Sequence, residues 1–192
     1  MAQYQEVFHG KRQRFLIRSA VGADAPALVR YMSLVNRETT FLSMEPGEFE
    51  RIFPVEREAQ LLEEWAASHY HLSLLALTED GEIAGSCNCA YSTEKQRYRH
   101  RASLGLSVRQ DFWRQGLGRR LLEVQQAWCR SQGITKLCLE VDTSNTAALG
   151  LYLRLGFEVE GTLRREVRLA DGTYRDLYVM GKFLDEDTAL RG

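Results

Sequence analysis

Long apolar runs are missing from this sequence. No stretch reaches the roughly 18 consecutive apolar residues that a membrane-spanning helix needs. The first residues, Met1 to Val7, also lack the apolar segment of a secretory signal peptide. We therefore expect a soluble, cytoplasmic protein with no membrane partner.

A surplus of charge of either sign is missing too. The 25 Lys and Arg residues nearly balance the 26 Asp and Glu residues, so no overall field attracts nucleic acid, and we expect no nucleic-acid partner. The basic run from Lys95 to Arg101 is the local exception. It predicts a solvated turn, with docking of an acidic partner or of the outer phosphate of coenzyme A as the alternative.

Cysteine is scarce, with four residues in a chain of 192. A chain of this length buries enough surface to need no disulfide framework. Cys87 and Cys89 have the spacing of one strand face, as have His69 and His71, and neither pair has the spacing of a zinc-binding Cys-x-x-Cys. We expect ordinary strand residues and no metal site.

The patterns that are present alternate between strand and helix. Short apolar runs predict strands at 15–18, 72–77, 83–91, 102–108, 136–141, 158–169 and 174–183. Helical spacing predicts helices at about 24–38, 54–65, 116–132 and 145–155. Asn145 is the expected cap of the last helix, Gly156 is expected just past its end, and 170–173 predicts a hairpin turn. The sequence thus predicts an α/β domain over residues 14–184, after a loose lead-in at 1–13 and before a tail at 185–192. Its sheet is mixed and mostly antiparallel, with about seven strands, a central parallel pair and about four flanking helices.

The densest signal for function is the run Trp113-Arg114-Gln115-Gly116-Leu117-Gly118-Arg119-Arg120, between a strand and a helix. The two glycines let a ligand approach the backbone, and the first turn of a helix presents N–H groups that favour an anion. A pyrophosphate suits this turn, while a plain tight turn is the alternative. The third glycine of a Rossmann fingerprint and the Gly-Lys-Ser/Thr ending of a Walker A loop are both missing.

A second run follows, Asn145-Thr-Ala-Ala-Leu-Gly-Leu-Tyr152-Leu-Arg-Leu-Gly156-Phe157. Together the two runs resemble the GNAT superfamily of acyl-CoA-dependent N-acetyltransferases, which combines Gln/Arg-x-x-Gly-x-Gly/Ala with Asn-x-x-Ala-x-x-Leu-Tyr-x-x-x-Gly-Phe. The second motif matches at every position, and the first departs only at Trp113. The resemblance covers about residues 14–184.

The resemblance implies a single-domain GNAT-like fold, acetyl-CoA as cosubstrate and acetyl transfer to a primary amine by direct attack in a ternary complex. Tyr152 is the implied general acid for the coenzyme A sulfur, since a phenol has a pKa just above that of a thiol. Glu140 is a candidate base acting through water, with a surface carboxylate as the alternative. The implied cofactor-binding residues are Leu106, Val108, Arg114, Gln115, Gly116, Leu117, Gly118, Arg119 and Asn145.

The acceptor stays open at this point. In the superfamily the segment 39–53 lies over the acceptor groove, and the C-terminal strands resemble branches acting on small amines or on ribosomal-protein N-termini. Alternatives are therefore a small-molecule amine, a peptide or protein N-terminus, and a non-catalytic acyl-CoA-binding sensor. A homodimer is likewise open.

Overall fold

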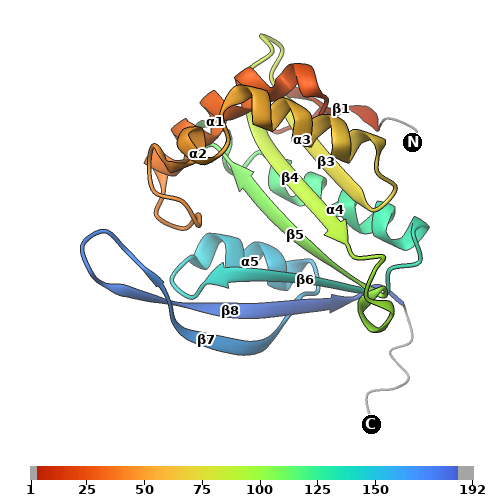
Figure 1. Ribbon diagram of the computed structural model, residues 1–192, viewed down its shortest axis with the longest axis vertical. Helices are drawn as coiled ribbons and strands as arrows, with labels where there is room; N and C mark the ends of the chain where they lie inside the picture. The colour runs from red at the N-terminus through yellow and green to blue at the C-terminus, as the bar shows by residue number, and fades with distance from the viewer. Residues whose placement is uncertain (1–3, 186–192) are drawn as a thin grey trace. The chain divides into compact units, whose positions relative to one another are not determined.

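A mixed sheet organises the computed structural model, which describes residues 4–185 (Figure 1). The strand order is β1-β2-β3-β4-β5-β6-β8-β7, with β5 and β6 as the parallel pair. The strands are β1 (Gln5–His9), β2 (Arg14–Ser19), β3 (His71–Leu77), β4 (Ile83–Tyr91), β5 (Arg101–Val108), β6 (Lys136–Asp142), β7 (Glu158–Arg168) and β8 (Tyr174–Phe183). The helices are α1 (Ala25–Glu38), α2 (Glu48–Ile52), α3 (Val55–Ala67), α4 (Leu117–Ser131) and α5 (Thr146–Arg154). The predicted fold class is confirmed, with one strand and one helix more than expected.

The chain divides into two compact units. Within the described residues, the first unit contains 4–89 and 105–125, and the second contains 90–104 and 126–185. Strand β5 and helix α4 each pass from one unit into the other. The predicted domain bounds at 14 and 184 stay a prediction, and residues 186–192 of the predicted tail lie outside the described residues.

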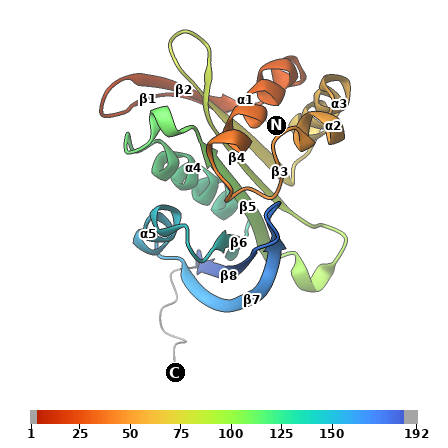
Figure 2. The same cartoon turned by 90° about the vertical axis from the view of Figure 1, so that its left-hand side faces the viewer.

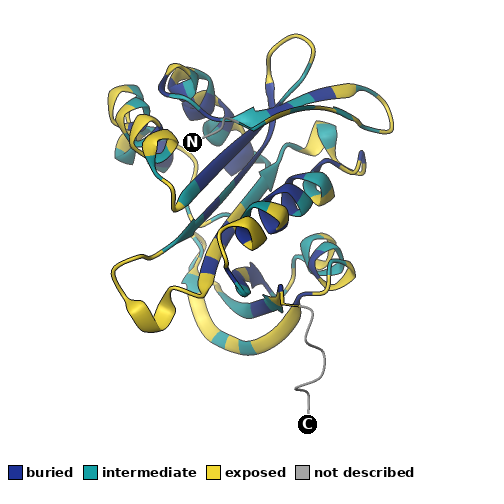
Figure 3. Cartoon of the chain, turned by 90° about the vertical axis from the view of Figure 1, so that its right-hand side faces the viewer, coloured by how far each residue is buried: buried dark blue, intermediate teal, exposed yellow. Residues whose placement is uncertain are grey.

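Apolar residues at strand and helix spacing build the core of the first unit. Strand β2 pairs antiparallel with β1 and with β3, and Figure 2 shows β1 and β2 as one hairpin. One face of α1 and α3 is buried, whereas the opposite face is exposed, as the dark blue and yellow of Figure 3 show. One buried cluster contains Ala20, Ala25, Leu28, Tyr31, Val35, Leu62, Leu75 and Ile83. This burial stabilises helices that would be marginal alone.

Helix α4 packs closely on β4 at Gly85. A Cβ added to Gly85 would lie 3.3 Å from Leu121 Cδ1 and 3.4 Å from Leu117 Cδ2, so glycine allows this close approach. One turn further on, the buried Gln125 amide donates to the carbonyl oxygens of Leu72 and Cys87, at 3.0 and 2.9 Å. These contacts fix where α4 begins, and the start of α4 is part of the candidate site.

Two segments differ from the sequence-based expectation. The lead-in at 1–13 was expected to be loose, yet it contains β1, which pairs with β2 from Gln5↔Arg18 to His9↔Arg14. The segment 39–53, expected as an irregular loop, contains the short helix α2. Both elements are only five residues long, which is too short for a clear periodic signal.

The second unit is built on antiparallel pairing of β8 with β6 and with β7. The predicted turn at 170–173 joins β7 to β8, and Gly172 has a φ of 85° there. The parallel pairing of β5 with β6 is short, from Arg101↔Lys136 to Ser103↔Cys138. Helix α5 ends at a left-handed Gly156 (φ 83°), as predicted.

No helix among residues 4–185 is long and apolar enough to cross a membrane. In the same residues, no three His, Cys, Asp or Glu side chains gather as metal ligands. All four cysteines are buried, and none of them forms a disulfide within the described part of the chain.

Candidate functional site

The glycine turn has the backbone geometry that requires glycine at one position. Gly116 has a φ of 87°, and the exposed Arg114 also has a positive φ, of 60°. Helix α4 begins at Leu117, and its first turn closes with a bond from Arg120 N–H to the Gly116 carbonyl at 3.0 Å. A Cβ on Gly116 would meet only Phe8 Cζ, at 3.4 Å. The turn therefore presents open backbone at the start of a long helix, which favours an anion.

The other residues predicted for this turn differ in exposure. Leu117 and Gln115 are buried, at 1% and 4% exposure, so only their backbone groups are candidates for ligand contact. Gly118 is half-buried inside α4. Leu106 and Val108 lie at the C-terminal end of β5. Both are half-buried, and both follow the short stretch in which β5 pairs with β6.

The three arginines of the turn differ in their partners. Arg119 pairs with Glu123 at 2.7 Å, and Arg120 pairs with Glu6 at 2.6 Å. Within residues 4–185, Arg114 makes no ion pair. Arg114 is thus the arginine whose charge is not already balanced by a carboxylate.

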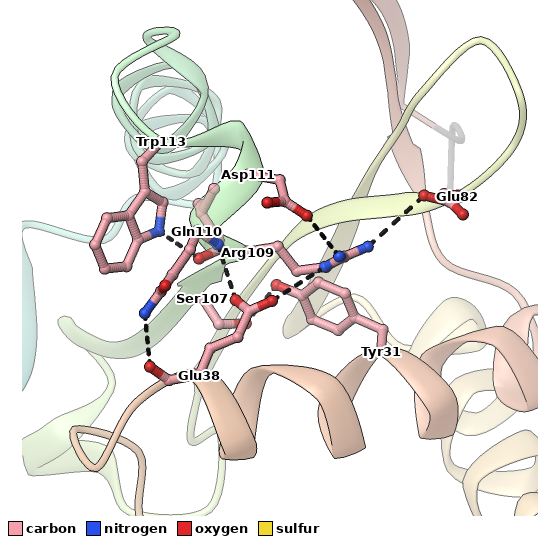
Figure 4. Close-up of polar contacts among 9 residues, drawn as sticks. Tyr31, Glu38, Glu82, Ser107, Arg109, Gln110, Asp111 and Trp113 are labelled. Carbon is pink, nitrogen blue, oxygen red and sulfur yellow. Dashed lines mark hydrogen bonds and ion pairs between the residues drawn. The ribbon is translucent and has the colours of Figure 1, made fainter.

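Trp113 occupies the position where the first motif usually has Gln or Arg. Its indole Nε1 donates to the carbonyl oxygen of Val108 at 2.7 Å, while the residue remains 43% exposed (Figure 4). The side chain therefore holds the end of β5 against the turn that follows it.

A polar network connects the end of α1, Glu82 just before β4 and the residues that follow β5 (Figure 4). Glu38 accepts a bond from the Gln110 backbone N–H at 2.8 Å and one from Arg109 Nε at 3.3 Å. Arg109 also pairs with Asp111 at 2.8 Å and with Glu82 at 3.6 Å. Sequence patterns do not reveal this network, because bonded partners such as Glu38 and Gln110 are 72 positions apart.

Tyr31 and Ser107 lie beside this network and are joined to each other through their hydroxyl groups (Figure 4). Tyr31 is 2% exposed, and its hydroxyl lies 2.9 Å from Ser107 Oγ. Burial raises the pKa of Tyr31 well above its ordinary value, so the phenol stays neutral. The Ser107 hydroxyl is therefore bonded to a neutral hydroxyl partner.

The second unit contains the remaining predicted residues. Asn145 Oδ1 accepts from the Ala148 N–H at 3.1 Å, which confirms the predicted cap of α5. The turn before it is fixed by buried Asp142, whose Oδ1 accepts from Ser144 N–H and Oγ at 2.8 and 2.6 Å. Tyr152 is 6% exposed, and its ring meets Phe157 edge-on at 5.7 Å between centroids.

Glu140 lies on β6, opposite Val179 of β8. It is exposed, whereas its neighbours Leu139 and Val141 are buried, so the alternation predicted for this strand is confirmed. Leu106, Val108 and residues 114–119 belong to the first unit, and Glu140, Asn145 and Tyr152 belong to the second.

A mixed sheet with one parallel pair, followed by a glycine turn at the start of a helix, has the architecture of an acyltransferase fold. Residues 39–157, more than half of the chain, match the model of the Acetyltransferase (GNAT) family. The chain belongs to this family.

Similar proteins of known name or structure agree with the family. A GNAT-family acetyltransferase from Streptococcus pneumoniae has a TM-score of 0.81 and 34% identity, and the match covers 88% of this chain and 99% of that one. The L-methionine sulfoximine/L-methionine sulfone acetyltransferase of Pseudomonas aeruginosa is 28% identical over 170 residues, 88% of this chain and 94% of that protein. The [ribosomal protein bS18]-alanine N-acetyltransferase of Escherichia coli is 38% identical over 89 residues. That last match spans 46% of this chain and only 56% of the relative's length.

Proposed function

We propose that this protein transfers an acetyl group from acetyl-CoA to a primary amine. The observation that carries the proposal is the open glycine turn at the start of α4, with Gly116 in a left-handed conformation and Arg114 without a carboxylate partner among residues 4–185. A pyrophosphate fits this arrangement, because the turn and the start of the helix offer backbone N–H groups and one unbalanced positive charge. A putative acetyltransferase from Salmonella typhimurium, solved with acetyl-CoA, shares this fold, with a TM-score of 0.75 and 22% identity.

In this proposal the cofactor is held mainly by backbone. The turn from Arg114 to Arg119 binds the pyrophosphate, and the Asn145 side chain adds a contact while it caps α5. The N–H groups near Leu106 and Val108 polarise the acetyl carbonyl, since these residues lie where β5 is no longer paired with β6. Arg114 supplies a positive charge for the pyrophosphate.

The proposed reaction has one bond-forming step at the carbonyl carbon. The amine nitrogen attacks, the carbon–sulfur bond breaks, and Tyr152 donates its phenolic proton to the leaving sulfur. The proton lost by the amine passes to water, with Glu140 as the proposed base behind that water. Glu140 then releases its proton to solvent and Tyr152 recovers one, so the enzyme returns to its starting state.

The acceptor is proposed as a small amine of the amino-acid type. The Pseudomonas relative, matched over nearly its whole length, is named for L-methionine sulfoximine and L-methionine sulfone. The ribosomal-protein relative is more similar locally, but its match covers about half of each chain. Length of match therefore favours the small acceptor, and a peptide N-terminus is the second candidate.

The test is a turnover screen with purified protein, acetyl-CoA and a panel of amines. The panel contains L-methionine sulfone, L-methionine sulfoximine, other L-amino acids, a polyamine and a short peptide with an N-terminal alanine. Thiol release reports turnover, and mass spectrometry identifies the acetylated amine. Amine-dependent thiol release supports the proposal, whereas tight acetyl-CoA binding without turnover on any amine favours a sensor.

A further inference from the structure

Glu38, the last residue of α1, joins two segments of the first unit (Figure 4). Its Oε2 accepts from the Gln110 backbone N–H at 2.8 Å, and the Gln110 side-chain Nε2 donates back to the Glu38 carbonyl oxygen at 2.6 Å. The residues after Glu38 form the segment 39–53. The residues after Gln110 lead directly into the glycine turn.

The contacts of Glu38 are more shielded than those of the other acids around Arg109. The Glu38 side chain is 21% exposed, whereas those of Glu82 and Asp111 are 66% and 70% exposed. Water and salt screen the two exposed pairs and weaken them. Hydrogen bonds with one charged partner, such as those to the Glu38 carboxylate, are the stronger kind. Glu38 is also the acid of this group that reaches the backbone of Gln110.

The turn at 109–113 is itself attached to the sheet of the first unit. The Arg109 N–H donates to the Ala84 carbonyl at 3.0 Å, and Trp113 holds the Val108 carbonyl at 2.7 Å. Phe112 meets the buried Phe15 edge-on at 5.9 Å. The turn therefore has a fixed position on the sheet, and Glu38 adds the link from that position to the end of α1.

We propose that Glu38 is a positioning residue that couples the glycine turn to the segment 39–53. A ligand that orders the turn fixes Gln110, and Gln110 fixes Glu38 through two reciprocal hydrogen bonds. The start of the segment 39–53 then becomes ordered as well. This inference rests on the proposed function, in which coenzyme A binds the turn, and on the resemblance to the superfamily, which implies that 39–53 lies over the acceptor groove. Because coupling between two sites is reciprocal, acceptor binding strengthens cofactor binding by the same factor.

The test measures hydrogen exchange in peptides that cover residues 39–53, with coenzyme A itself as the probe. In the unmodified protein we expect saturating coenzyme A to slow exchange there by about fivefold or more, the lower end of typical coupling between sites. In Glu38→Ala we expect this protection to be lost, although calorimetry still detects coenzyme A binding. The matched control is Glu82→Ala, which removes another partner of Arg109 but leaves Gln110 bonded, and which should keep the protection.

Each outcome decides between the two proposals. Failure of the unmodified protein to bind coenzyme A would overturn the proposed function and the coupling together. Binding with unchanged exchange in 39–53 would overturn the coupling alone, as would full protection in Glu38→Ala or equal loss in Glu82→Ala. If Glu38→Ala does not fold, Glu38→Gln replaces it. That variant keeps an oxygen for the Gln110 N–H, loses the ion pair with Arg109, and should show less protection than the unmodified protein.

Discussion

Arg120 of α4 is bound to Glu6 of β1 by two hydrogen bonds, both 2.6 Å long. The Tyr4 hydroxyl donates to the same carboxylate. The hydrogen bonds from Arg120 hold the pKa of Glu6 below its ordinary value. Since Glu6 already balances its charge, Arg120 attaches the N-terminal hairpin to the helix and adds little positive charge to the glycine turn.

Replacing Arg120 should therefore affect stability more than cofactor binding. For Arg120→Gln we expect a loss of about 1 kcal/mol in the free energy of unfolding, as for a partly exposed, well-aligned ion pair. The dissociation constant of acetyl-CoA should change by less than about threefold, because no charge facing the ligand is lost. Urea unfolding and calorimetric titration measure the two quantities. Tenfold weaker binding at unchanged stability would show that Arg120 faces the phosphates after all.

Arg114 should show the opposite behaviour. It has a φ of 60°, a conformation that is strained for a residue with a Cβ, and it has no ion-pair partner within residues 4–185. Arg114→Gly should raise stability by up to about 1 kcal/mol by relieving strain. The same change should weaken acetyl-CoA binding about tenfold, as expected when one charge-assisted contact is lost. Arg114→Lys is the control, since it keeps both the charge and the strain, and it should bind nearly as well as the unmodified protein.

The two glycines of the turn have different roles. Gly116 has a φ of 87°, whereas Gly118 lies inside α4 and is not among the residues with positive φ. Gly116→Ala should therefore lower stability by about 1 kcal/mol or more. Gly118→Val should leave the fold intact and weaken acetyl-CoA binding, because a branched side chain would project where the backbone meets the ligand. Normal titration of acetyl-CoA by a folded Gly118→Val protein would contradict a binding role for this position.

How far the sequence predicted these features depends on how local they are. The cap at Asn145, the left-handed Gly156 and the turn before β8 involve neighbouring residues, and the sequence predicted all three. It did not distinguish Gly116, which precedes α4 with a positive φ, from Gly118, which lies within α4, because both glycines stand at the predicted start of the helix. The links from Glu38 to Gln110 and from Glu6 to Arg120 join residues far apart in the chain. The spacing of residues in a sequence does not predict such long-range pairs before the fold is known.

The burial of His71 leads to a prediction of how the free energy of unfolding depends on pH. Its ring stacks on Trp65 at 4.2 Å between centroids, and its Nε2 is buried without a hydrogen-bond partner among residues 4–185. Burial lowers the pKa of His71 from its ordinary value of 6.5 to about 4. Between these values the unfolded chain binds the proton and the folded protein does not. The free energy of unfolding therefore falls as the pH decreases from 6.5 towards 4.

The loss over this range should be about 1–2 kcal/mol after allowance for the partial exposure of the ring. His71→Phe keeps an aromatic ring against Trp65 and removes the titrating group, so its stability should depend less on pH in this range. His100→Gln is the control, since His100 is exposed, and its profile should follow that of the unmodified protein. Urea unfolding at a series of pH values measures the slopes, and equal slopes for the His71→Phe and unmodified proteins would count against a buried neutral imidazole.

Tyr152 tests the proposed chemistry most directly. Its ring packs edge-on against Phe157, and the residue is buried on the helix capped by Asn145. Tyr152→Phe keeps the ring and removes the phenolic hydroxyl, which is the proton donor. If Tyr152 protonates the leaving sulfur, kcat should fall, while the dissociation constant of acetyl-CoA stays nearly constant. General acids typically contribute 10²- to 10⁴-fold, and a thiolate is a fair leaving group, so we expect a decrease of about 10²-fold. Tyr174→Phe, at an exposed tyrosine of β8, should leave kcat unchanged.

Steady-state kinetics with the acceptor found in the turnover screen, beside a binding titration, provide the measurement. A kcat for Tyr152→Phe within about threefold of the unmodified protein would mean that water or another group protonates the sulfur.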